Sequence, residues 1–173
     1  SGNSRWYYYN DKWQITAAYN NSDAVTTFIY GNYVDEALRM TNSSGTYYYS
    51  HDQLYSPVVL VDAAGTPQER YEYDAFGSAR IYDGTFSSTR SQPLASIGNP
   101  YLFTGREVDY LDNGSRPLQY NRHRYYSQSL GRWTSEDPLG IDPSGGLSHN
   151  PFAVSKQYGD SGVFQQPHSH LFR

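Results

Sequence analysis

Two five-residue stretches, Asn42-Ser43-Ser44-Gly45-Thr46 and Asp62-Ala63-Ala64-Gly65-Thr66, follow the same pattern 20 positions apart in the chain. Each has an Asn or Asp, two small residues and then Gly-Thr. The Asn or Asp side chain can bond the backbone two residues further on, and Gly can adopt the positive φ that closes a hairpin. The pattern therefore predicts tight turns at 42–46 and 62–66.

The stretches on either side of these turns are typical of β-strands. Apolar residues precede each turn, at 38–40 and 58–61, and tyrosine-rich stretches follow, at 47–49 and 71–74. Tyrosine, of which the chain has 19, favours pleated, half-buried surfaces. Almost no window shows the apolar spacing of an amphipathic helix. We therefore expect an all-β fold, a curved sheet of antiparallel hairpin repeats with little helix.

The overall composition excludes several classes of function. The chain has 173 residues, a net charge of −4 and no cysteine. Without a basic field it is not expected to bind nucleic acid, and without an apolar run of roughly 18 residues it is not expected to span a membrane. It also has no phosphate-binding glycine loop or cofactor fingerprint, so we expect no cofactor.

Changes in composition suggest four parts. Hairpin repeats occupy 1–83, and 84–99, rich in small polar residues and containing Pro93, is expected to be a loop or insertion. Strand-like sequence resumes at 101–103 and 118–126, with Asp112-Asn113-Gly114 predicted as a hairpin turn, so 100–146 forms a third part. The tail, 147–173, has no clear period and is expected to dock on a neighbouring subunit.

Several of these stretches resemble a known family. Tyr71-Glu72-Tyr73-Asp74-Ala75-Phe76-Gly77 resembles the YD repeat, and the C-terminal third resembles the RHS-associated core. The core elements appear in order as Phe103-Thr104-Gly105-Arg106-Glu107, Tyr120 to Tyr126, Leu130-Gly131-Arg132-Trp133 and Asp137-Pro138-Leu139-Gly140. The residues of this chain that match the core motif are Gly105, Arg106, Tyr125, Tyr126, Gly131, Arg132, Asp137, Pro138 and Gly140. The corresponding turn positions in the repeats are Asn42, Gly45, Asp62, Gly65, Asp74 and Gly77.

The resemblance implies hairpins that wind into a β-shell enclosing a toxin or effector, with the core closing one end and releasing the effector by aspartyl self-cleavage. The present chain departs from that pattern. It has too few repeats to close a shell, and Glu136 stands where some members carry Arg. The segment that should lead to a second Asp-Pro-x-Gly is reduced to 146–151 and lacks tyrosine.

Few residues are candidates for chemistry. Asp137 and Asp142 are the only carboxylate pair that qualifies as a proteolytic dyad, but five residues of Pro- and Gly-rich chain are too short to bring them face to face, so we interpret both as turn residues. His168 and His170 lack the further ligands that a structural zinc site requires, so no metal is expected. Asn20, Asn42 and Asn113 begin sequons and are candidate glycosylation sites if the chain is secreted.

These observations predict a non-enzymatic structural protein, secreted or on the surface of a bacterial cell. Its partner is expected to be another copy of itself or another surface protein. The strand at Trp6–Asn10 carries no charge between Trp6 and Tyr9 and no proline, so it is poorly protected against pairing, and we expect a filament, sheath or coat. One alternative is a processed fragment of an effector-delivery shell that retains self-cleavage, and another is a carbohydrate-binding surface module.

Overall fold

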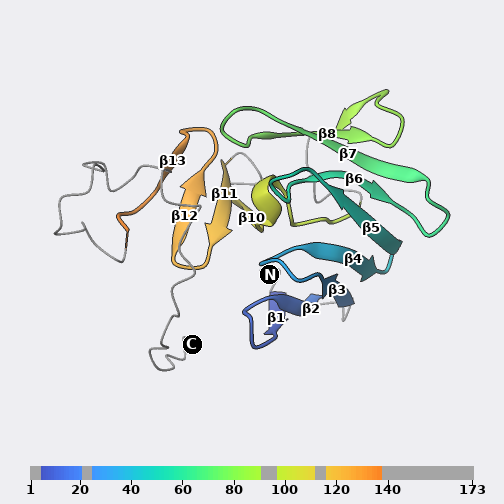
Figure 1. Cartoon of the computed structure of the whole chain (residues 1–173), viewed down its shortest axis with the longest axis horizontal. Helices are drawn as coiled ribbons and strands as arrows, with labels where there is room; N and C mark the ends of the chain where they lie inside the picture. The colour runs from blue at the N-terminus through green and yellow to red at the C-terminus, as the bar shows by residue number, and fades with distance from the viewer. Residues whose placement is uncertain (1–4, 21–24, 91–96, 112–115, 138–173) are drawn as a thin grey trace.

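The computed structural model describes residues 5–20, 25–90, 97–111 and 116–137, and these residues form two antiparallel sheets (Figure 1). The fold class predicted from the sequence is confirmed, and the described residues contain no α-helix. The large sheet contains β1 (Arg5–Tyr9), β2 (Ile15–Asn20), β3 (Val25–Tyr30), β4 (Ala37–Asn42), β5 (Gly45–His51), β6 (Pro57–Val61), β7 (Pro67–Tyr73), β8 (Ala79–Asp83) and β9 (Thr89–Arg90). The small sheet contains β10 (Val108–Leu111), β11 (Arg116–Asn121), β12 (Arg124–Ser127) and β13 (Arg132–Trp133).

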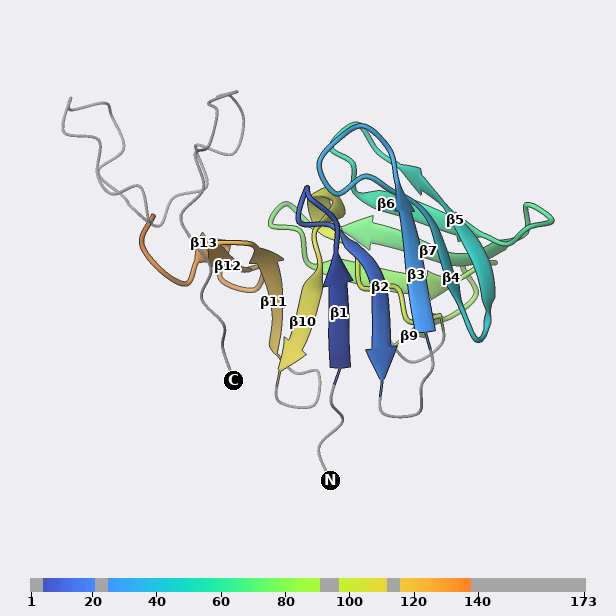
Figure 2. The same cartoon turned by 90° about the horizontal axis from the view of Figure 1, so that it is seen from below.

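Both sheets are meanders, because within each sheet every strand pairs with the strands that precede and follow it in the chain. Figure 2 shows the small sheet on one side of β1 and the other strands of the large sheet on its other side. The strands of the large sheet change direction strongly from β1 to β7, as expected from the right-handed twist of β-strands (Figure 2). Among the described residues, no helix is long and apolar enough to cross a membrane.

One turn geometry recurs between the strands of the large sheet. An Asn or Asp side chain accepts hydrogen bonds from the backbone N–H groups two and four residues further on, at distances between 2.8 and 3.0 Å. The residues that accept them are Asn10, Asp52, Asp62, Asp74 and Asp83. Each turn is therefore stabilised by a side chain that the local sequence supplies.

The two stretches that share a sequence pattern do not share this geometry. Asp62 bonds the N–H groups of Ala64 and Thr66, whereas Asn42 bonds only that of Ser44. Asn42 pairs directly with Gly45, so the loop between β4 and β5 has only two residues. The structure places turns at both predicted positions, but the interpretation of them as copies of one turn is wrong, because Gly45 already belongs to the following strand.

The fourth residue of the recurring turn has a positive φ, and it need not be glycine. Gly65 and Gly77 occupy this position with φ of 80° and 86°, whereas Trp13, Tyr55 and Phe86 occupy it with φ of 61°, 63° and 62°. Bulky residues rarely adopt this conformation. The sequence pattern that required glycine therefore missed three of the five turns.

The core lies on the inward face of the large sheet. Buried side chains come from successive strands, and the segment 97–108 covers them with four more. The strand members are Ile15, Ala18, Phe28, Ala37, Met40, Tyr47, Tyr49, Leu60, Tyr71 and Ile81; the covering members are Ile97, Tyr101, Leu102 and Val108. The segment after the predicted loop is thus the second wall of the core.

Two local predictions are wrong. The expected strand at 101–103 is a bridge between Tyr101 and Glu107 followed by the 3-10 turn η1 (Phe103–Gly105), because Thr104 and Gly105 both have positive φ. The segment 84–99, expected to be a loop or insertion without a strand, contains the two-residue strand β9, because the turn at Asp83 folds the chain back onto β8. The predicted turn at 112–114 and the tail at 147–173 lie outside the described residues.

Candidate functional site at the seam between the two sheets

A chain of buried polar groups joins the large sheet to the segment that covers it. Asn99, fully buried, accepts a hydrogen bond from the Tyr49 hydroxyl (2.8 Å) and donates one to the Tyr71 hydroxyl (3.1 Å). The Tyr71 hydroxyl in turn donates to the fully buried carboxylate of Glu69 (2.6 Å). Because buried polar groups are costly unless hydrogen-bonded, this network fixes the position of the covering segment.

A second tyrosine pair makes a similar link. The hydroxyls of Tyr30 and Tyr101 lie 2.6 Å apart, and the Tyr30 hydroxyl donates to the carbonyl oxygen of Ile15 (2.7 Å). Burial raises the pKa of both phenols above its usual value. These hydroxyls are therefore neutral and hydrogen-bonded at ordinary pH, which suits a structural role and not a general base.

Charged groups tie the small sheet to the large one. The carboxylate of Asp35, in the turn between β3 and β4, binds Arg106 through one oxygen and Arg122 through the other. The Arg122–Asp35 distance is 2.8 Å, and the Asp35 side chain is only 13% exposed. Arg106 follows η1, and Arg122 lies in the turn between β11 and β12. One carboxylate therefore holds two parts of the C-terminal segment.

Among the two dyad candidates, only Asp137 lies in the described residues. Its Oδ2 is 3.1 Å from Nη2 of Arg124, whose guanidinium lies over the ring of Trp133, 4.0 Å from the centroid. Arg124 therefore both stacks on an aromatic ring and pairs with a carboxylate. Asp142, Pro138 and Gly140 lie outside the described residues, as do His168 and His170. The prediction that Asp137 is not part of a dyad therefore stays a prediction.

The other core-motif residues make contacts between the sheets or within the small one. The hydroxyl of Tyr126 donates to the carbonyl oxygen of Phe76 (3.1 Å), and that of Tyr125 donates to Asp109 (3.0 Å). Gly131 has a φ of 61°, and a Cβ there would lie 2.7 Å from the Phe76 ring. Arg132 pairs with Ser127 across β12 and β13. Two of the motif residues, Tyr126 and Gly131, thus lie against Phe76 of the β7–β8 turn.

The candidate glycosylation sites differ in how the structure uses them. The Asn42 side-chain nitrogen donates to the carbonyl oxygen of Ile97 (2.6 Å), a bond that a glycan on this nitrogen would disturb. Asn20 is half-buried at the end of β2, and Asn113 lies outside the described residues. Asn42 therefore serves as an anchor for the covering segment.

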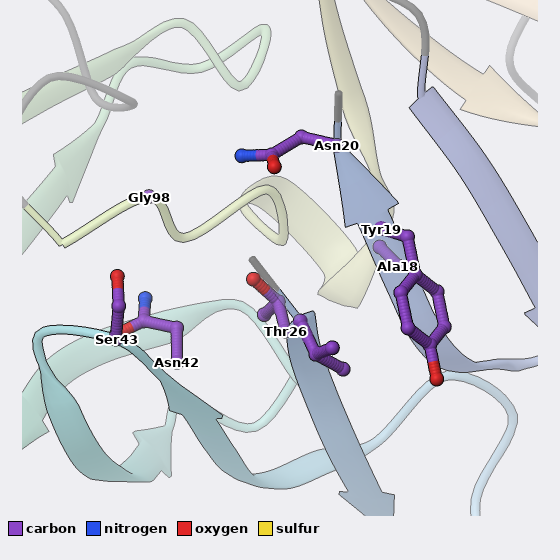
Figure 3. Close-up of a pocket in the computed structure, with 8 residues that line it drawn as sticks. Ala18, Tyr19, Asn20, Thr26, Asn42, Ser43 and Gly98 are labelled. Atoms are coloured by element: carbon purple, nitrogen blue, oxygen red, sulfur yellow. The ribbon is translucent and has the colours of Figure 1, made fainter. Parts of the chain in front are cut away.

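A small polar pocket lies beside this anchor. Figure 3 shows the amide of Asn20 and the side chains of Thr26, Asn42 and Ser43 around it, with the Tyr19 ring pointing away. Its volume is about 120 Å³, below the roughly 300–1,000 Å³ of typical ligand pockets. Within the described residues, no group of three or more His, Cys, Asp or Glu side chains could hold a metal ion.

Sequence reasoning missed several residues on both sides of this seam. Asp35, Glu69 and Asn99 belong to no motif that was singled out, although each has a side-chain partner in the structure. A carboxylate within a β-strand, as at Glu69, and an Asn-Pro at 99–100 were the available signals. Neither identifies a partner, because the partners lie far away in the sequence.

Comparisons with known proteins agree with the resemblance of the sequence to RHS-type proteins. The chain is 25% identical over 134 residues to "Double-stranded DNA deaminase toxin A" of Burkholderia cenocepacia (strain H111), a match covering 76% of this chain and 8% of the toxin. It is 30% identical over 99 residues to "Putative uncharacterized protein YibJ" of Escherichia coli (strain K12), covering 54% of this chain and 34% of that protein. No family model matches the chain.

Among solved structures, the fold is similar to that of TcdB2-TccC3 without its hypervariable C-terminal region. The TM-score is 0.51 with 20% sequence identity, and the match covers 80% of this chain and 8% of that one. At this identity the likeness concerns the fold alone. The chain thus spans 8% of the toxin and of this solved structure, and about a third of the second curated relative.

Proposed function

We propose that this chain is a non-enzymatic structural module, a strip of RHS-type wall that another strand extends at β1. The main support for this proposal is the position of β1 at the edge of the large sheet, where β2 is its single partner among the described strands. An edge strand presents backbone N–H and C=O groups that a further strand can pair with. Trp6 and Tyr8 are 55% and 59% exposed, and no charge or proline interrupts Trp6 to Tyr9.

No described strand of the small sheet pairs with the free edge of β1. Burial, and next to it the negative charge of Glu107, which directly precedes β10, raises the pKa of Tyr9 to about 12. However, β10 pairs with β11 and forms no ladder with β1. β1 and β10 lie close together in Figure 2 but are separated in Figure 1. This arrangement leaves the edge of β1 available to a second copy, which would give the assembly outside a bacterial cell that the sequence predicts.

Light scattering across a range of concentrations tests this proposal. The parent chain is expected to associate, and Tyr8→Lys to remain monomeric, because a lysine on an edge strand opposes pairing. Ile29→Lys is the matched control, since Ile29 is also exposed (46%) but lies on β3 between two partners. A monomeric parent, or equal association of the parent and Tyr8→Lys, would contradict the proposal.

A second candidate function is suggested by the toxin named among the relatives. Since the chain spans only 8% of that protein, the same strip can serve as part of a delivery shell with a self-cleaving core. We expect no cleavage, because the Oδ2 atom of Asp137 is bound to Arg124. Intact mass measured over time at mildly acidic pH tests this. A fragment beginning within 139–151 that Asp137→Asn abolishes would favour the shell.

A further inference from the structure

Three turns meet at one end of the large sheet. They span residues 31–36, 52–56 and 102–106. In the third turn, the backbone N–H of Thr104 donates to the hydroxyl of Ser56 (3.0 Å), which is fully buried. The contact is unusual for a turn, because its backbone group is satisfied by a residue 48 positions away. The turn at 102–106 is therefore held by the large sheet as well as by its own hydrogen bonds.

The glycine of this turn approaches the sheet closely. Gly105 has a φ of 69°, and a Cβ there would lie 3.1 Å from the carbonyl oxygen of Asp35 and 3.2 Å from that of Tyr55. Both are backbone atoms, which yield less easily than side chains. Tyr55 is further fixed by stacking on Tyr33, with ring centroids 3.9 Å apart and planes 7° from parallel. Any side chain at position 105 would therefore crowd these two carbonyl oxygens, and a residue other than glycine would also be strained at this positive φ.

The arginine of the turn completes the contact. Arg106 binds one oxygen of Asp35, and Arg122 of the small sheet binds the other. The side chains of Arg106 and Asp35 are 18% and 13% exposed, so solvent screens the pair less than it would on an open surface. The guanidinium matches a carboxylate in shape as well as charge. The turn thus contacts the large sheet in three ways: Thr104 through a backbone hydrogen bond, Gly105 through close backbone packing and Arg106 through an ion pair.

We propose that Asp35, Ser56 and the carbonyl groups of Asp35 and Tyr55 form a recognition socket for a Thr-Gly-Arg turn, here that of residues 104–106. The socket holds the C-terminal segment against the large sheet as a bound partner, so that the two halves stay associated without a peptide link between them. The core-motif residues Gly105 and Arg106 thus dock the C-terminal segment onto the large sheet. The proposal is independent of strand addition at β1, which lies elsewhere on the large sheet.

Cutting the chain after it has folded tests this directly. A protease recognition sequence replaces residues 91–96, the folded protein is cut, and the pieces are separated by gel filtration over a dilution series. The two pieces of the parent are expected to elute together at micromolar concentration. Pieces that separate at once would overturn the proposal.

Variants of the cut protein identify the contacts responsible. Asp35→Asn and Gly105→Ala are each expected to raise the dissociation constant of the pieces by at least about tenfold, because they remove a charged pair or force the turn away. The loss is partial, since the buried contacts of Tyr101 and Leu102 remain. Glu72→Gln, an exposed carboxylate that binds the Tyr82 hydroxyl, is the control and should leave the constant unchanged.

A second measurement separates recognition from general packing. Arg106→Lys keeps the charge but not the planar fork, so an intermediate rise in the dissociation constant is expected if the carboxylate is read by shape. In the uncut chain, Asp35→Asn should speed amide exchange in 108–133 and leave 37–83 unchanged. If Asp35→Asn matches the parent in both experiments, or if exchange rises equally in both regions, the socket is not what holds the segment.

Discussion

The large and the small sheet have the same antiparallel connectivity but are stabilised in different ways. In the large sheet, five turns are closed by an Asn or Asp of the turn itself, and the strands share one buried face. The small sheet has strands of two to six residues and is tied to the large one by the Tyr126–Phe76 bond and the Arg122–Asp35 pair. Short hairpins are marginal by themselves. The small sheet is therefore expected to depend on the large one, and the reverse dependence should be weaker.

Leu60→Ala should have the largest effect on this relationship. Leu60 is fully buried at the centre of the large sheet, so its truncation is expected to cost about 3 kcal/mol of unfolding free energy. Both sheets should then unfold at the same, lower urea concentration. Val58→Ala, on the same strand but 37% exposed, should change the free energy by less than about 1 kcal/mol. If the small sheet survived the loss of the large one in Leu60→Ala, it would be independent.

Gly65→Val tests the contribution of the turns in the large sheet. Nothing lies within 4 Å of the position a Cβ would take, so the loss should come from backbone strain at a φ of 80° and amount to about 1–2 kcal/mol. Ala63→Val, exposed in the same turn, should have a smaller effect. The thermal midpoints of the two variants decide the matter. Equal midpoints would mean that the turn does not depend on glycine.

Acid should weaken the same turns. Hydrogen bonds from the hydroxyls of Ser87, Ser88 and Thr85 hold the pKa of Asp83 well below its usual value, and the N–H of Thr66 lowers that of Asp62. Because the pKa values of these carboxylates are lower in the folded chain, their stabilisation is present above about pH 4, the unfolded value, and is lost as the pH falls further. The thermal midpoint of Asp83→Asn should therefore fall less than that of the parent between pH 5 and pH 2. Parallel curves would contradict this.

Trp13→Gly should have the smallest effect. Trp13 is 65% exposed and has a φ of 61°. Glycine there relieves about 1–2 kcal/mol of backbone strain but costs about 0.5–1 kcal/mol, because it loses more backbone freedom on folding. Loss of the Tyr9 contact offsets part of the gain, so a change between zero and a slight rise in the thermal midpoint is expected. Tyr55→Gly should be destabilising instead, because Tyr55 has the same φ but stacks on Tyr33. A marked loss in Trp13→Gly would show that its ring supports the hairpin.

Much of the large sheet could be predicted because its determinants are local. The apolar and tyrosine stretches around 42–46 and 62–66 predict strands that pair with their neighbours in the chain, and the structure has them. The prediction of turns failed where it relied on a single residue type to mark a backbone conformation. Glycine was taken as the mark of a positive φ, yet Trp13, Tyr55 and Phe86 adopt it.

The sequence by itself determined the all-β class, the antiparallel meander and the positions of two hairpin turns, because each depends on side chains that act within a few residues of one another. Only the tertiary structure decided that 97–108 covers the core, that Phe103–Gly105 is a turn and that Asp35 binds both Arg106 and Arg122. These arrangements join residues as much as 87 positions apart. A partly buried charge or a buried backbone group is costly unless it is paired, so these arrangements depend on a distant partner, and no local pattern specifies which partner that is.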